Sequence, residues 1–501
     1  MRFVDLFKVQ SPEIRALHFT WIAFFICFFT WFNMAPLATT MVKESGGWLT
    51  FKDIKLLTVC NVALAIPARI FIGMLHDKYG PRRCYTALMV LMAIPCIVFA
   101  FGDTKAQLVI ARLFLGLIGA SFSIGIHMTA LWFKPKDIGF AEGIYGGWGN
   151  FGAAGAAMII PWIAISFFGG PDGWRYAMAA NAMVLMAYGI VYYFVVTDGP
   201  DTVKYNVTRQ TLAMEVGTRA DMIKLIAVTV PLFGILAVVV WKIYRGGFIG
   251  AGGSIVAYGV IIAVIIYQII QIIRVNRPIL DKGVPEDDKY PFGSVIALNS
   301  AYFVTFGAEL AVVSMLPAFF ETTWALSPAK AGLIASSFAF LNIIARPLGG
   351  YLSDRFADRR LVLVVFMFGI AFGFFLMGLI TEAWPIIMAT AAMIFCSFFV
   401  QGGSGATFAM VPMVKRRLTG QISGMVGAYG IVGAVVFTVV YASAETANQF
   451  FFLISGAACL SFVICMLMLK EPHGSFADEY HLSSVDKEIR RHNNTVKKGN
   501  G

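Results

Sequence analysis

Two stretches of this sequence, ARIFIGMLHDKYGPRR at residues 68–83 and ARPLGGYLSDRFADRR at residues 345–360, are copies of one pattern. Alanine, arginine, glycine, leucine, aspartate and the closing pair of arginines recur in the same order and at one constant offset. The repeat places Arg69 and Arg346 at matching positions inside apolar helices. A guanidinium keeps its charge, and an unpaired one in hydrocarbon costs about 3 to more than 10 kcal/mol. We therefore expect the two arginines to surround a counter-charge, and a bound anion is the first candidate.

The composition predicts an all-α polytopic membrane protein. Hydrophobic residues make up 58% of the 501 residues, charged residues only 13%, and the mean hydropathy is +0.76. A membrane-spanning helix needs about 20 apolar residues. Fourteen runs reach that length, near residues 18–41, 55–75, 84–101, 106–133, 140–168, 175–196, 223–241, 247–273, 293–320, 328–353, 361–380, 384–410, 418–441 and 449–469.

Charge sets the predicted orientation. The opening MRFVDLFKVQSPEIRALHF lacks a short apolar core followed by small residues, so we expect no removable signal peptide. Placing both termini in the cytoplasm assigns most of the 39 Lys and Arg residues to cytoplasmic segments, as the positive-inside rule requires. The net charge of +11 reflects this asymmetry and predicts no nucleic-acid partner. We expect a multi-pass protein of the plasma membrane.

A second repeat divides the chain into halves. GIYGGWGNFG at residues 143–152 and GMVGAYGIVG at residues 424–433 share four glycines, and Gly147 adds one to the first copy. The matched pairs are Gly143 with Gly424, Gly146 with Gly427, Gly149 with Gly430, and Gly152 with Gly433. Two repeats at nearly one offset predict two six-helix bundles with pseudo-two-fold symmetry about the membrane normal. The predicted units are 1–196, a linker at 197–292, 293–470 and a cytoplasmic tail at 471–501.

The linker carries two further hydrophobic stretches, and an even number of added spans keeps both bundles in one orientation. Lys242 and Arg245 lie in its external turn, against the charge rule. A hairpin lying in the membrane interface is therefore the alternative to two added spans.

The loops after the arginines, HDKYGPRR and SDRFADRR, resemble the loop that follows helices two and eight in the major facilitator superfamily. Their aspartates can pair with loop arginines or cap the next helix, joining helix two to three and eight to nine. A gate on the cytoplasmic side and a simple topology anchor are both open. The candidate gating residues are Asp77, Arg82, Arg83, Asp354, Arg359 and Arg360.

The two glycine-rich helices resemble the signature of the nitrate/nitrite porter family within that superfamily. The resemblance implies that Arg69 and Arg346 grip nitrate or nitrite from both sides and that Asn150 borders the substrate. It also implies a pocket lined by Tyr302 and Phe306. The second copy departs from the signature, with Ile431 where the first has Asn150. The glycines themselves give each helix a smooth face, for sliding or for static packing.

Three other polar residues lie inside apolar helices. Glu309 shares a helical face with Tyr302 and Phe306, so it is a candidate to carry a proton or to pair with an arginine. His127 is a second titratable candidate, with a packing role as its alternative. Arg112 has no repeat and is expected to be interfacial or structural.

These patterns predict a secondary transporter of nitrate, nitrite or both, working by alternating access through proton symport or anion exchange. A carrier of another small anion, such as an organic phosphate or carboxylate, and a membrane anion sensor without transport are the alternatives. No nucleophile with a base, no phosphate-binding loop and no CxxC pair occurs, so we expect no enzyme, no cofactor, no metal and no disulfide framework. We expect a monomer in the bilayer, moving the anion and protons.

Overall fold

A computed structural model describes residues 1, 3–200, 213–284, 289–356 and 358–471 of the chain, and every regular element in these ranges is helical. Fourteen helical segments among the described residues are long and apolar enough to cross a membrane. The predicted all-α polytopic fold is confirmed. The predicted tail lies, apart from Glu471, outside the described residues.

The first six spans are built from ten α-helices, several of them joined end to end. After the short η1 (Phe3–Phe7), they are α1 (Pro12–Phe32) with η2 (Ala35–Leu37) and α2 (Ala38–Glu44), α3 (Phe51–Ala63) with α4 (Ala65–Tyr79), α5 (Pro81–Ala100), α6 (Lys105–Leu115) with η3 (Gly116–Ala120) and α7 (Ser121–Trp132), α8 (Pro135–Asn150) with α9 (Gly152–Trp162) and η4 (Ile163–Phe168), and α10 (Gly173–Val195).

Two long helices follow, and then six further spans. They are α11 (Arg219–Arg245), α12 (Ala251–Lys282), α13 (Phe292–Trp324), α14 (Pro328–Phe340) with α15 (Asn342–Arg355), α16 (Arg359–Gly378), α17 (Ile386–Val414), α18 (Thr419–Ser443) preceded by η6 (Arg416–Leu418), and α19 (Ala447–Met468).

Both arginine-bearing spans break at the same point of the repeat. Leu64 separates α3 from α4, and Leu341 separates α14 from α15, each five residues before its arginine. Proline lies close to each break, and it has no N–H to bond the carbonyl four residues earlier. In the second copy, Pro347 frees the carbonyl of Ile343, which accepts a hydrogen bond from Trp148 Nε1 of α8 at 3.3 Å. The break thus supplies a contact between the two halves.

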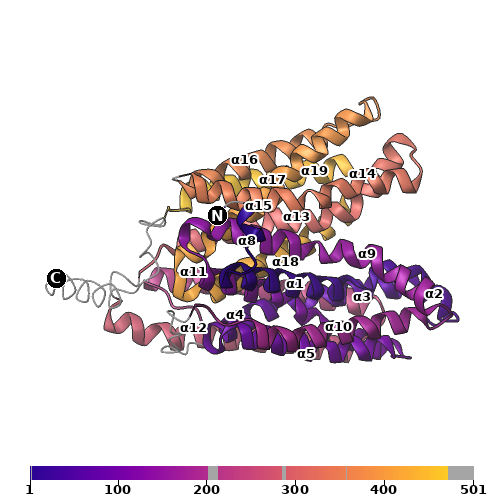
Figure 1. The fold of residues 1–501 in the computed structure, drawn as a ribbon, viewed down its shortest axis with the longest axis horizontal. Coiled ribbons are helices and arrows are strands. Elements are labelled where there is room, and N and C mark those ends of the chain that lie inside the picture. The colour runs from indigo at the N-terminus through magenta and orange to yellow at the C-terminus, as the bar shows by residue number, and fades with distance from the viewer. Residues whose placement is uncertain (2, 201–212, 285–288, 357, 472–501) are drawn as a thin grey trace.

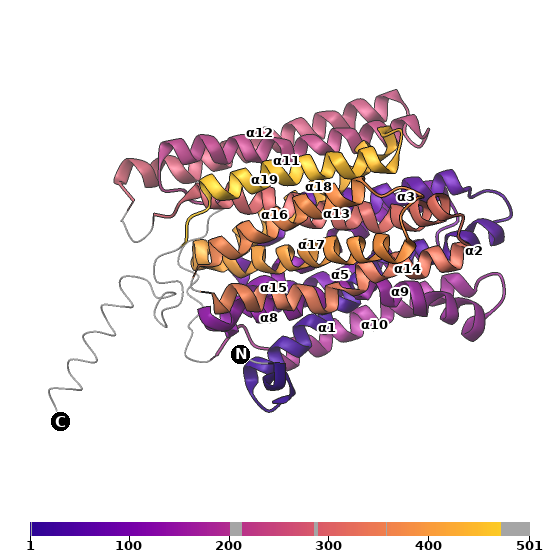
Figure 2. The same cartoon turned by 90° about the horizontal axis from the view of Figure 1, so that it is seen from above.

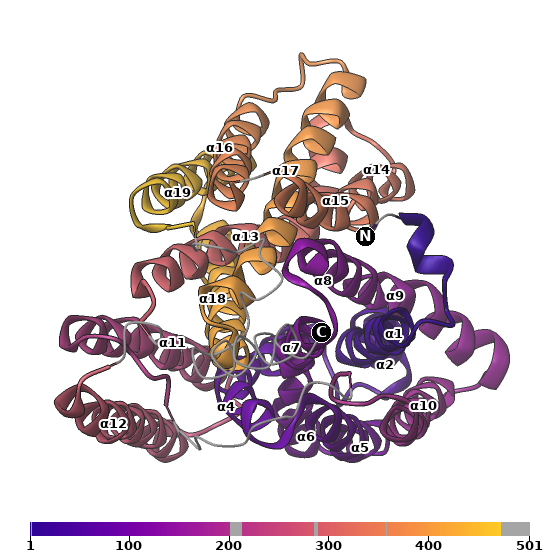
Figure 3. The same cartoon turned by 60° about the vertical axis from the view of Figure 1, so that its left-hand side comes forward.

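Two groups of helices meet along a seam, as Figure 3 shows. Across it, α8 packs on α15 and α4 packs on α18, and α7 contacts α17 and α18. Contact concentrates at the end that carries the C-termini of α4 and α15, here called the latch end. Toward the other end the helices of the two groups diverge (Figure 1), and no extensive contact joins α9 to α14 or α3 to α18 in the described ranges.

The central helices α11 and α12 lie outside the seam. In Figure 2 they run along the bundle, which favours spanning helices over an interfacial hairpin. Helix α11 packs on α3, α4 and α18, whereas α12 has its main contacts with α11 alone. Only 17% of the most apolar window of α12 is buried, so most of that helix presents hydrophobic side chains outward, as lipid contact requires.

Candidate functional site

The two repeated arginines meet at the seam. Arg69 comes from α4 and Arg346 from α15, and their side chains are 0% and 1% exposed. Each lies just beyond a helix break and on a helix that packs across the seam. Arg346 is close enough to Arg69 to act on it electrostatically, so the two positive charges face one buried region.

The Arg69 guanidinium is only partly satisfied. Its Nε donates to Gly119 O at 2.9 Å and its Nη1 donates to Gly427 O at 2.5 Å. Its Nη2 is buried and has no hydrogen-bond acceptor among the described residues. The carbonyl of Gly427 belongs to the second glycine repeat, so this arginine already joins the two halves.

Arg346 is satisfied on one side as well. Its Nη2 donates to the Tyr302 hydroxyl at 3.0 Å, whereas Nη1 is buried with no acceptor in the described part of the chain. No ion pair joins either arginine to a carboxylate of the described residues. Two cations with one open donor each are therefore available to an anion that carries several acceptor oxygens.

Phe122 lies close to both guanidinium groups. Its ring centroid is 5.2 Å from Arg69 Cζ and 5.6 Å from Arg346 Cζ, within cation–π range of both. Tyr302 stacks on Phe122 with centroids 5.8 Å apart, and Phe306 stacks on Tyr302 at 5.1 Å. Phe408 packs edge-on against both Phe122 and Tyr302. Phe122 and Phe408 could not be predicted from the sequence, because an aromatic residue in an apolar span resembles any other core residue.

Asn150 and Glu309 differ in how well they are satisfied. Asn150 is the last residue of α8, and its side chain is buried. Neither its amide nitrogen nor its amide oxygen has a hydrogen-bond partner among the described residues. Glu309 Oε1, in contrast, accepts from Asn342 Nδ2 at 2.8 Å. Arg346 acts on Glu309 only at longer range, so no salt bridge between them exists in this conformation.

The repeated glycines divide into two sets with different neighbours. In the first set, a Cβ on Gly143 would lie 2.6 Å from Pro347 Cα, and one on Gly424 would lie 2.3 Å from Arg69 O. Gly146 and Gly427 touch the arginine side chains in the same way, and a Cβ on Gly147 would meet Asn342 O at 2.8 Å. These glycines let α8 and α18 approach the arginine helices across the seam.

The second set packs within each half. A Cβ on Gly149 or Gly152 would meet Phe24 or Phe25 of α1, and one on Gly430 or Gly433 would meet Tyr302 or Phe303 of α13. The pattern is the same in both halves, so the repeat encodes two helix crossings per glycine helix. Close packing is what the structure records for all of them.

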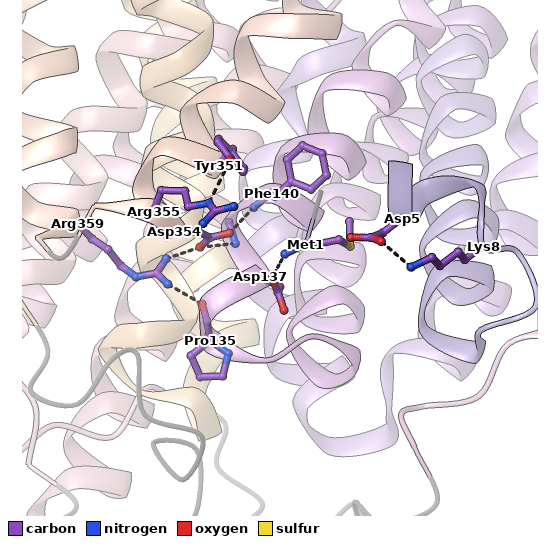
Figure 4. Close-up of polar contacts among 11 residues, drawn as sticks. Met1, Asp5, Lys8, Pro135, Asp137, Phe140, Tyr351, Asp354, Arg355 and Arg359 are labelled. Carbon is purple, nitrogen blue, oxygen red and sulfur yellow. Dashed lines mark hydrogen bonds and ion pairs between the residues drawn. The ribbon is translucent and has the colours of Figure 1, made fainter. Parts of the chain in front are cut away.

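Asp354 forms one half of the contacts at the latch end, shown in Figure 4. Its carboxylate accepts from the backbone N–H groups of Gly139 at 3.0 Å and Phe140 at 2.8 Å, near the N-terminus of α8. Arg359 Nη1 donates to the same carboxylate at 2.8 Å, and its Nη2 donates to Pro135 O at 2.5 Å. A helix N-terminus attracts a carboxylate, so Asp354 holds α8 to α15.

Asp77 forms the matching half. It accepts from the N–H groups of Gly420 and Gln421, both at 3.0 Å, at the N-terminus of α18. Of the two predicted roles, pairing with a loop arginine is seen for Asp354, which binds Arg359 at the start of α16. The capping alternative is wrong, because the backbone N–H groups that both aspartates bind belong to the opposite bundle. We call the contacts of Asp77 and Asp354 the latch.

His127 lies at the latch, away from the two arginines. Its Nδ1 is 2.9 Å from His76 Nδ1 and 3.3 Å from Asp77 Oδ1. In the described ranges these three residues are the one group whose potential metal-ligand atoms lie within 4.8 Å of one another. The short separation of the two imidazole nitrogens is that of a hydrogen bond.

The other loop arginines do not join the latch. Arg82 donates its backbone N–H to Asp198 at 2.6 Å, and Arg83 is exposed. Burial raises the pKa of Asp198, and this Arg82 hydrogen bond and the charges of Arg82 and Arg83 oppose the shift. Arg360 binds Met466 O and Glu471.

The contacts of Arg112 favour the structural alternative. The side chain is fully buried, and it donates to Asn33 Oδ1 at 2.9 Å. Its Cζ also lies 4.1 Å from the centroid of the Phe99 ring.

Comparison with known proteins gives consistent results. A family model described as Major Facilitator Superfamily matches residues 20–275 and 298–493. The chain is 43% identical to the nitrate/nitrite transporter NrtP of Picosynechococcus sp. over 94% of its own length and 95% of that protein's. It is 41% identical to NrtP of Nostoc punctiforme, again over 94% and 95%. The probable nitrate/nitrite antiporter NarK1 of Thermus thermophilus is 26% identical over 92% of each chain.

Solved structures share the fold. The proton:xylose symporter XylE superposes with a TM-score of 0.62 at 15% identity, covering 94% of this chain and 98% of that one. The human organic anion transporter MFSD10 gives a TM-score of 0.61 at 14% identity, covering 91% and 100%. At this identity the likeness concerns the arrangement of helices alone.

Replacing Asp354 with Asn is expected to loosen the latch. The amide loses the ion pair with Arg359 and weakens two charge-assisted hydrogen bonds, each worth about 1.5–3 kcal/mol. Amide hydrogen exchange at Gly139 and Phe140 should therefore accelerate about tenfold or more. Asp358→Asn is the matched control, because Asp358 caps its own helix α16 at Leu361 N. Unchanged exchange in Asp354→Asn contradicts the latch.

Replacing Gly424 with Ala is expected to lower the thermal unfolding temperature of the purified protein. The added methyl meets the Arg69 carbonyl at 2.3 Å, so α18 has to move away from α4. Overpacking of this kind costs about 1–3 kcal/mol. Gly456→Ala in α19 is the control, since nothing lies within 4 Å of its Cβ position. Equal unfolding temperatures for the two variants would show that the close crossing does not matter.

Proposed function

Because this chain belongs to the nitrate/nitrite porter family of the Major Facilitator Superfamily, we propose that it moves nitrate, nitrite or both across the membrane. Its relatives are transporters by name, and transport leaves the substrate chemically unchanged. The anion binds between Arg69 and Arg346, and the two bundles alternate around it.

The observation that carries this proposal is the pair of open guanidinium donors. Arg69 Nη2 and Arg346 Nη1 are buried and have no acceptor among the described residues, and both guanidinium groups lie within cation–π range of one aromatic ring. A buried cation without a counter-ion is costly, so a bound monoanion lowers the free energy of the site. A planar oxyanion offers in-plane oxygens that suit guanidinium donors.

The surrounding residues favour a small anion over an organic one. Phe122, Tyr302, Phe306 and Phe408 pack ring against ring around the arginines, which leaves little polar surface for a larger cargo. The unpartnered amide of Asn150 supplies an N–H donor at the end of α8. We assign Arg69, Arg346, Asn150, Tyr302 and Phe306 to the anion site, and add Phe122 as an aromatic wall within cation–π range of both charges.

The latch indicates which state of the proposed transport cycle this conformation represents. Asp77 and Asp354 close one end, the helices diverge toward the other, and the side chains of the two arginines are buried between the ends. We assign the latch end to the cytoplasm, in agreement with the charge bias of the loops, so this conformation faces outward. Both termini then lie in the cytoplasm, and the protein acts as a monomer in the plasma membrane. The bundles are 1–196 and 293–470.

A gradient has to drive uptake. Bringing a monoanion into a negative interior is opposed by about 2.3 kcal/mol per 100 mV. Symport with more than one proton makes net entry electrically favourable, and exchange for another monoanion is electrically neutral. The experiment that tests the proposed function is uptake of labelled nitrate and nitrite into proteoliposomes. An anion sensor would bind the label without moving it, and a carrier of organic anions would leave nitrate outside.

Replacing Arg69 or Arg346 with Lys is expected to reduce nitrate uptake about 100-fold or more. An ammonium group keeps the charge but loses the planar fork and the hydrogen bonds to Gly427 O or the Tyr302 hydroxyl. Arg355→Lys, on the same helix as Arg346 but exposed, is the matched control and should transport normally. Near-normal uptake by both site variants would remove the pocket assignment.

Replacing Tyr302 with Phe is expected to raise the KM for nitrate about five- to tenfold with little change in the maximal rate. The ring stack on Phe122 and Phe306 is kept, whereas the hydrogen bond that orients Arg346 is lost, and such a bond contributes about 1 kcal/mol. Initial rates over a range of nitrate concentrations measure the change. An unchanged KM would mean that Arg346 needs no support from this hydroxyl.

A further inference from the structure

Glu142 on α8 is a buried carboxyl group that the anion site does not use. It is 2% exposed, and neither carboxyl oxygen has a hydrogen-bond donor among the described residues. No described cation forms an ion pair with it. The other acids near the seam are satisfied differently. Glu309 accepts from Asn342, and the latch aspartates each accept two backbone N–H groups.

A carboxylate without donors or a paired cation is unfavourable in a buried place, whereas the neutral acid is tolerated. The geometry therefore requires Glu142 to hold a proton while the latch is closed. Opening the latch end would bring water to the group, and a hydrated carboxylate no longer needs that proton. Glu142 is thus protonated while the latch is closed and can ionise once the latch is open.

Glu142 also lies between the latch and the anion site on one helix. Gly139, three residues before it, donates its N–H to Asp354. Gly146, four residues after it, touches the Arg346 side chain and lies about 6 Å further along the helix axis. Helix α8 therefore connects a proton on Glu142 to the latch at one end and to the anion at the other.

The charges around Glu142 explain the direction of coupling. Asp354 on α15 opposes its ionisation, while Arg416 on η6 and Arg359 on α16 favour it. With the latch closed both arginines are engaged elsewhere, Arg359 with Asp354 and Arg416 with Phe133 O. An ionised Glu142 would repel Asp354 and compete for Arg359, which weakens the latch.

Other ionisable groups near α8 already have partners. Helix α7 contributes His127, which is bonded to His76, and α1 contributes His18, whose ring nitrogens contact Leu6 O and Trp21 Nε1. Helix α17 has Cys396 as its one ionisable side chain, and α9 has none.

We propose that Glu142 is the site of the co-transported proton, which it takes up from the outside while the latch is closed and releases to the cytoplasm when the latch opens. The inference rests on the proposed anion transport and names its coupling ion. One proton adds to a carboxylate oxygen and is later released to water, so no other reactant is needed.

The experiment uses the full chain in liposomes with the membrane potential clamped. Two rates are measured with labelled nitrate: accumulation driven by an acid exterior, and nitrate-for-nitrate exchange without a gradient. In Glu142→Gln the neutral amide imitates the protonated acid. Gradient-driven accumulation should then fall about tenfold, the ratio that one pH unit supplies, while exchange continues. Glu309→Gln should keep its accumulation, and Glu382→Gln, in an exposed loop, is the matched control.

A second variant, Glu142→Asp, keeps the proposal testable if Glu142→Gln does not fold. It retains a carboxyl group, so it should keep coupling with a shifted dependence of accumulation on external pH. Full gradient-driven accumulation in Glu142→Gln, or an unshifted pH dependence in Glu142→Asp, would overturn the inference. Exchange without any proton-driven accumulation in the unaltered chain would overturn it too, and would leave the proposed anion transport standing. If the unaltered chain showed no exchange and no nitrate binding, the proposed function itself would be rejected.

Discussion

The structure depends on two buried positive charges that the protein does not neutralise. Arg69 and Arg346 each give some donors to neighbouring groups and keep one buried donor without an acceptor among the described residues. Isolated cations of this kind destabilise an apolar interior, and the proposed anion between them would offset that cost. The surrounding aromatic rings, the close glycine crossings and the latch all keep these two charges at the seam.

Pseudo-symmetry explains how one short pattern builds both sides of the site. Each half supplies a broken helix, an arginine five residues after the break, and an aspartate that binds the opposite bundle. The two halves differ at a few residues, which give each half its own contacts. Arg359 pairs with Asp354, whereas His127 and His76 stand beside Asp77. Asn150 occupies the position that corresponds to Ile431 in the second half, so the two sides of the proposed anion site differ.

The glycine helices combine two tasks that a larger residue would exclude. One set of glycines brings α8 and α18 against the arginine helices across the seam, and the other packs each of them on a helix of its own bundle. A helix with small residues on two faces can shift against the neighbour on one face while it keeps its packing against the neighbour on the other face. Helix α8 carries the latch contact, Glu142, the glycines and Asn150 in that order. A displacement at its N-terminus would therefore move the residues of the proposed anion site.

The sequence by itself determined the membrane class, the fourteen spans, the two related halves and the paired arginines. The length of an apolar run, a repeated motif and a charged residue within such a run can all be read from the order of the residues alone. Only the tertiary structure decided that the latch aspartates bind the opposite bundle, that Phe122 lies within cation–π range of both guanidinium groups, and that Arg112 donates to Asn33. It also decided that Glu142 has no donor in the described ranges while Glu309 has one. Such distinctions depend on which side chain lies opposite another across helices far apart in the chain, and helical periodicity specifies the face of a residue without naming its partner.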